Sequence, residues 1–75
     1  MQLLAARSLY TSDLLECAEL HPSPNDTEVW VVLIRSNDGK TYFIVDENEK
    51  VRQVDLNKAV SIIRQIGFHS VEVFF

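Results

Sequence analysis

The chain has 75 residues, which is enough for one domain with a small core, so the sequence predicts a single domain over residues 1–75. Hydrophobic residues make up 47% of it and charged residues 24%, a balance typical of folded proteins that excludes a disordered chain. The net charge of −4 disfavours nucleic acid and anionic membrane surfaces as partners, and no apolar run is long enough to span a bilayer.

The cellular compartment is indicated by the cysteine content and by the first residues. Cys17 is the single cysteine, which excludes an internal disulfide and fits a reducing cytosol. The apolar start MQLLAARSLY has no basic stretch before it and no cleavage pattern, so we expect no signal peptide. The sequence therefore predicts a cytoplasmic protein.

Residues 1–20 form an N-terminal segment that is compatible with two structures. Thr11-Ser12-Asp13 followed by Glu16 has the pattern of a helix N-terminus, with a helix through residue 20. DLLECAEL, residues 13–20, is equally compatible with a strand, and we favour a strand there with a helical turn before it. Pro22 and Pro24 then each remove a backbone donor, which predicts a surface loop over residues 21–27.

The clearest strand is EVWVVLIR, residues 28–35, which is rich in β-branched residues and apolar on both alternating faces. Ser36-Asn37-Asp38-Gly39 predicts a turn in which Gly39 takes a positive φ. KTYFIVD, residues 40–46, is then the returning strand of a hairpin. A second turn over residues 46–49 and a short third strand over residues 50–54 follow.

A helix is predicted over residues 56–66. Asp55 suits the N-cap, because its carboxylate can accept bonds from free backbone amides, and Gly67 suits the position just after the helix. The apolar residues with the spacing of one helical face are Leu56, Ala59, Val60, Ile63 and Ile66. HSVEVFF, residues 69–75, is predicted to be a final strand with Val71, Val73 and Phe75 on one face.

These elements predict an α+β fold in which a mostly antiparallel sheet of three to five strands packs on one main helix. Residues 28–75 follow the order strand–strand–strand–helix–strand. One helix covers one face of a sheet, so the other face needs cover from the N-terminal segment or from a second copy of the chain. The predicted interaction surface consists of Trp30, Val32, Ile34, Tyr42, Phe74 and Phe75.

We find no pattern of catalytic, cofactor-binding or metal-binding residues. Cys17, His21 and His69 fall short of the four ligands of a structural zinc site, and no motif supports a Cys/His nucleophile pair. The acidic run that begins at Asp46 fails as a calcium loop, because lysine and valine occupy its fifth and sixth positions. Phosphate-binding loops need more glycines than the two present. The sequence therefore predicts no enzyme.

From Trp30 onward the sequence WVVLIRSNDGKTYFIVDENEKVRQVDLNKAVSIIRQIGFHSVEVFF resembles a type of short uncharacterised bacterial protein. In these proteins a hairpin with the pattern VLLR–DG precedes a helix that ends in LGF and a final strand. Some of them carry labels related to plasmid replication. The resemblance implies a bacterial hairpin–helix–strand protein and brings no catalytic residues.

The leading hypothesis is a small non-enzymatic interaction or regulatory module that acts as a homodimer and recognises another protein through its sheet edge or apolar face. The first alternative is an accessory factor of a mobile element that touches nucleic acid, with Trp30 and Tyr42 stacking on bases near Arg35 and Lys40. The second alternative is a small metal protein built on Cys17 and a histidine.

Overall fold

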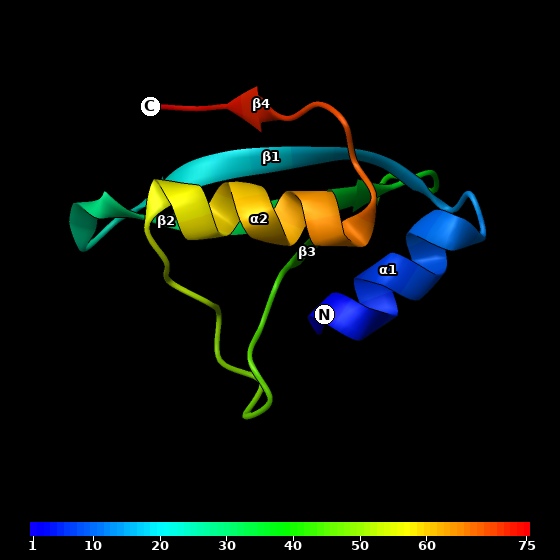
Figure 1. Cartoon of the computed structure of the whole chain (residues 1–75), viewed down its shortest axis with the longest axis horizontal. Coiled ribbons are helices and arrows are strands. Elements are labelled where there is room, and N and C mark those ends of the chain that lie inside the picture. The colour runs from blue at the N-terminus through cyan, green and yellow to red at the C-terminus, as the bar shows by residue number, and fades with distance from the viewer.

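A computed structural model describes the whole chain, residues 1–75, and confirms the predicted α+β class (Figure 1). The elements in chain order are α1 (Leu3–Thr11), β1 (Leu15–Ser23), β2 (Asp26–Ser36), β3 (Thr41–Phe43), α2 (Leu56–Ile66) and β4 (Glu72–Val73). The strand order in the sheet is β3-β2-β1-β4. β2 pairs antiparallel with β1 and β3, whereas β4 runs parallel to β1, so the sheet is mixed.

Both helices pack on the same face of the sheet and enclose one hydrophobic core. Ala6 of α1 lies in this core together with residues of β1, β2 and α2. The largest fully buried side chains are Leu20, Val32, Ile34, Ile44, Ile62 and Ile66. No helix covers the opposite face of the sheet, which we call the uncovered face. Neither helix has the length and apolar character needed to cross a membrane.

α2 has the bounds that the sequence predicts. Asp55 Oδ1 accepts a hydrogen bond of 2.7 Å from the Lys58 N–H, and Gly67, at φ +132°, donates its N–H to the Ile63 carbonyl. The buried face is rotated from the predicted one: Ile62 is buried, whereas Val60 is 38% exposed. α1 packs against α2, and the side of α2 that carries Val60 faces only the short segment around β4.

The N-terminal segment contains a full helix, α1, where we expected a helical turn, followed by the favoured strand. The predicted loop over residues 21–27 is wrong, because β1 continues to Ser23 and β2 begins at Asp26. Pro22 is tolerated in β1 opposite Trp30. The N–H and the C=O of Trp30 both bond to Val54, on the side of β2 that faces away from β1. No hydrogen bond therefore joins Trp30 to Pro22, and the missing N–H of Pro22 leaves no group of β2 without a partner.

Three predicted strands are shorter than expected. β3 ends at Phe43. The Ile44 N–H still donates to the Val32 carbonyl of β2, but the Ile44 carbonyl accepts from the Arg52 N–H, and the chain then leaves β2 for the predicted turn at Asp46. Residues 50–54 form only single bridges, Val45–Val51 and Trp30–Val54, and no continuous third strand. The final strand is regular over only two residues, and its parallel direction was not expected. The hairpin turn itself is confirmed, with Gly39 at φ +87°.

The two edges of the sheet differ. At the β3 edge the Met1 amino group donates to the Phe43 carbonyl at 2.9 Å, and the Val45 N–H donates to the Met1 carbonyl at 2.8 Å. The start of the chain therefore covers the outer side of that hairpin. At the other edge β4 pairs with β1 on one side, and no hydrogen bond joins its outer side to another segment of the chain.

Candidate functional site

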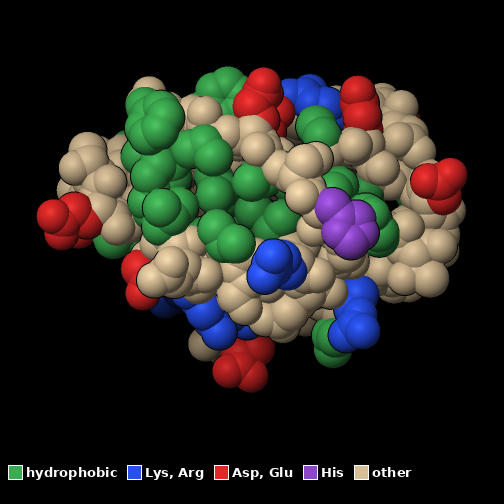
Figure 2. Space-filling model, turned by 45° about the horizontal axis from the view of Figure 1, so that its top comes forward, with side chains coloured by type: hydrophobic (Ala, Val, Ile, Leu, Met, Phe, Trp, Pro, Cys, Tyr) green, Lys and Arg blue, Asp and Glu red, His purple; other side chains and the backbone are tan.

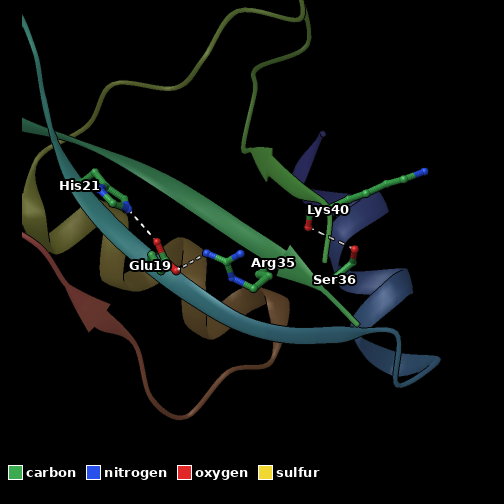
Figure 3. Close-up of polar contacts among 5 residues, drawn as sticks. All are labelled: Glu19, His21, Arg35, Ser36 and Lys40. Carbon is green, nitrogen blue, oxygen red and sulfur yellow. Dashed lines mark hydrogen bonds and ion pairs between the residues drawn. The ribbon is translucent and has the colours of Figure 1, made fainter. Parts of the chain in front are cut away.

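The uncovered face carries a cluster of three charged or titratable side chains, Glu19, His21 and Arg35 (Figure 3). Residues that pair across neighbouring strands point to the same face of a sheet. Glu19 of β1 pairs with Leu33 of β2, which points away from the helices, so Glu19 lies on the uncovered face. His21 Nε2 donates to Glu19 Oε1 at 2.8 Å, and Arg35 Nη2 donates to Glu19 Oε2 at 3.2 Å. Both oxygens of the Glu19 carboxylate are therefore paired, which allows its side chain to be only 9% exposed.

The electrostatics of this cluster favour a charged Glu19. The hydrogen bond from His21, assisted by the hydrogen bond and charge of Arg35, holds the pKa of the Glu19 carboxyl below its usual value despite the opposing effect of burial. The same pairing with Glu19 raises the pKa of Arg35. Because the carboxylate is saturated by its own neighbours, the cluster has the character of a structural ion pair.

The cluster also helps to fix the position of the C-terminal segment. The His21 ring stacks on Phe74 with ring centroids 4.5 Å apart and planes 5° from parallel. The Phe74 N–H donates to the Leu20 carbonyl at 2.9 Å. A side-chain stack and a backbone bond thus both hold the segment after β4 against β1.

The residues considered for metal or nucleophilic chemistry do not form a compact group. Cys17 and His21 lie on the same face of β1, but four residues of strand separate their Cα atoms by about 13 Å, with Glu19 between them. His69 lies exposed just after α2. No three histidine, cysteine or acidic side chains lie close enough together to hold a metal ion. This geometry does not support the Cys/His hypothesis.

A second feature is an apolar patch between α2 and the C-terminal segment, visible as the hydrophobic area in Figure 2. A shallow groove of about 520 Å³ runs between Val60 and Ile63 of α2 and Val71 before β4. A smaller hollow of about 230 Å³ lies beside Trp30 and Phe75. We define the apolar patch as the side chains of Trp30, Leu56, Val60, Val71, Val73 and Phe75.

The patch is well exposed and continuous along β4. Val73 lies beside Leu20, a core residue, so Val71, Val73 and Phe75 all project to the helix-covered side of the sheet. Val73 is 40% exposed and Leu56 45% exposed, and the Phe75 side chain extends into solvent. Arg64 and His69 lie at the end of the groove next to Val71.

The predicted interaction surface is divided among three places. Val32 and Ile34 lie in the core beneath the helices, 1% and 0% exposed, so they cannot contact a partner. Tyr42 is paired with Ile34 and turns to the same covered face, whereas Phe74 lies on the uncovered face. Trp30 and Phe75 stay together in the apolar patch, with ring centroids 6.1 Å apart.

Sequence reasoning missed Leu56 and Val60 as surface residues because it assigned them to the buried face of the helix. Their spacing of four residues placed them side by side on α2, which was correct. Whether that side of the helix met the core or solvent depended on the neighbours of α2, which periodicity does not report.

Comparisons of the chain with protein-family models, curated proteins and solved structures found no match.

Proposed function

We propose that this chain is a non-catalytic protein-interaction module that binds through the outer edge of β4 and the adjoining apolar patch. The observation that carries the proposal is the coincidence of two features at one place. An edge strand with no partner on its outer side borders a row of exposed apolar side chains that continues onto α2. Edges and apolar surfaces of this kind are both prone to association.

The backbone of the C-terminal segment is arranged to accept another strand. The Phe74 N–H points inward, to the Leu20 carbonyl of β1. Backbone groups of successive residues in a strand point to opposite sides, so the N–H and C=O groups of Val73 and Phe75 point outward. An extended segment of a partner can pair with these groups, which is the usual mode of β-strand addition.

The side chains of the patch complement this backbone interaction. A strand added beside β4 places alternate side chains on the helix-covered side, next to Val73 and Val60, where they bury apolar surface of both partners. The covered β3 edge offers no such site, since Met1 already bonds there. The saturated Glu19 cluster on the uncovered face, which leaves no free carboxylate oxygen for catalysis, also supports binding over chemistry.

We also propose that the module acts in the cytoplasm, a location consistent with its single free thiol, Cys17.

Site-specific photo-crosslinking in the cells that produce the protein tests the proposal. A benzophenone amino acid at Val60, 38% exposed in the patch, should give a discrete covalent adduct with a partner chain. The matched control is the same group at Val51, which is 39% exposed but lies in the loop before α2. Equal adducts at both positions, or none at Val60, would contradict the proposal.

A further inference from the structure

We infer that the partner strand is β4 of a second copy of this chain, paired antiparallel to the first about a two-fold axis through Val73. The inference rests on the proposed function and names the occupant of the same edge. Such a pairing would join two four-stranded sheets into one continuous sheet of eight strands. A two-fold interface requires a self-complementary surface, and the C-terminal segment has one.

The backbone selects the register. In an antiparallel pair, residues that exchange both N–H···O=C bonds face each other. Val73 presents both groups outward, so Val73 of each copy can face its equivalent across the axis. Val71 then faces Phe75 of the second copy, and both of these residues also present their backbone groups outward. Every outward-pointing pair in the segment therefore finds a hydrogen-bonding partner.

The side chains agree with this register on both faces. On the helix-covered side, Val73 meets Val73, and Val71 meets Phe75, so the whole row is apolar. On the uncovered side, Glu72 of one copy lies opposite Phe74 of the other. The two Glu72 carboxylates thus do not face each other across the axis, and like-charge repulsion is avoided.

The dipoles of the two α2 helices also point in opposite directions in this arrangement. α2 and β4 run in opposite directions along the sheet, as Figure 1 shows, and the two-fold axis makes the two α2 helices antiparallel. The end that carries Arg64 and His69 lies beside Val71 and therefore faces the Asp55 end of the second copy's α2.

The spacing of the layers leaves room for the apolar patch in the interface. Strands lie about 4.8 Å apart, so the two β1 strands would be about 14 Å apart. α2 packs on β2, one strand farther from the axis, so the two α2 helices would not pack directly on each other. The space between the two helices is the place where Val71, Val73 and Phe75 of both copies would meet. The dimer would therefore cover exposed side chains of the apolar patch, Val73 and Phe75 among them.

A charge-pair experiment tests the register. Val73→Lys and Val73→Asp each place equal charges face to face on the axis, and each should weaken self-association by roughly tenfold or more in light scattering. Mixed in equal amounts, the two variants should recover a species of twice the 8.6 kDa chain mass. Val51→Lys, at an equally exposed position, should leave the wild-type dimer intact. Circular dichroism of each variant confirms that it is folded.

A cross-link provides the second measurement. In a Cys17→Ser background, Val73→Cys should form an intermolecular disulfide under mild oxidation, because facing hydrogen-bonded residues have Cα atoms about 5.5 Å apart. Val51→Cys is the control and should form no intermolecular disulfide, because this residue lies outside the interface. A dimer in which neither charge mixing nor the cross-link works would overturn this register.

The outcomes separate the inference from the proposed function. A wild-type chain that stays monomeric at high micromolar concentration overturns the self-pairing. If crosslinks from Val60 then still give a discrete adduct whose mass differs from two chains, the proposed function stands with a different partner. If those crosslinks are absent as well, both ideas fail.

Discussion

The imidazole of His21 and the phenyl ring of Phe74 lie face to face, 4.5 Å apart and 5° from parallel. His21 belongs to β1, in the interior of the sheet, whereas Phe74 belongs to the segment that follows the two-residue strand β4. Because only two residues of β4 pair with β1, this stack is one of the few contacts that hold the proposed binding edge in position.

Phe74→Ala should therefore loosen β4 from β1. We expect the free energy of unfolding to fall by about 1 kcal/mol, the size of an aromatic pair contribution. Hydrogen exchange at the amide of residue 74, which bonds to the Leu20 carbonyl, should become faster. Phe43→Ala is the control, since Phe43 is 45% exposed in β3 at the other edge. Unchanged exchange at residue 74 would show that the stack does not hold the strand.

The lowered pKa of Glu19 predicts loss of stability in acid. A carboxyl whose pKa is lower in the folded chain than in the unfolded chain stabilises the fold above the unfolded pKa, about 4.3 for glutamate. This contribution is lost as the pH falls through the folded pKa. We expect urea denaturation to show a declining free energy of unfolding below about pH 4.

Glu19→Gln isolates this contribution. Asp38 and Asp46 also have pKa values below their usual range, through hydrogen bonds from Ser36 and from the Lys50 backbone, so the wild-type pH profile sums several groups. The Glu19→Gln variant should be less stable at neutral pH by about 1 kcal/mol, because its amide cannot accept from both His21 and Arg35. Its stability should decline less between about pH 5 and pH 3. Parallel profiles for the two proteins would exclude a role for Glu19.

Gly67 should not tolerate a side chain. A Cβ at this position would lie 2.5 Å from two carbons of the Tyr10 ring, and the backbone φ of +132° disfavours L residues. Gly67→Ala should lower the free energy of unfolding by about 2 kcal/mol or more through combined strain and overlap. Gly39→Ala is the matched control, because φ is +87° there but nothing lies near the added atom. It should cost about 1 kcal/mol, measured by the same urea titration.

The first turn of α2 depends on the side chain of Asp55. Asp55→Ala removes the acceptor for the Lys58 N–H and should lower the free energy of unfolding by about 1 kcal/mol. Asp55→Asn retains an oxygen acceptor and should be close to wild type in thermal or urea unfolding. Equal loss in both variants would indicate that the negative charge at the helix start matters more than the cap.

Much of the local structure could be predicted from the sequence because local chemistry decides it. The helix over residues 56–66 begins at a capping aspartate and ends at a glycine, and both signals act within one turn. The hairpin around Gly39 follows from a positive-φ turn between two β-branched segments. The prediction that Pro22 lies in a loop and not in a strand was wrong. Proline lacks a backbone N–H, but this matters only where that N–H would point at a partner strand, and the register of the sheet decides where it points.

Long-range packing decided the remaining features. EVWVVLIR is apolar on both faces, so its sequence alone does not say that Trp30, Val32 and Ile34 turn to the helices while Val31 and Leu33 turn away. The parallel approach of β4 to β1 and the side of α2 left open beside it likewise depend on contacts between distant segments. Composition and local periodicity determined which elements form, since those depend on neighbours in the chain. Only the tertiary structure decided which apolar residues are buried and which form the exposed patch, because burial depends on what lies opposite each face.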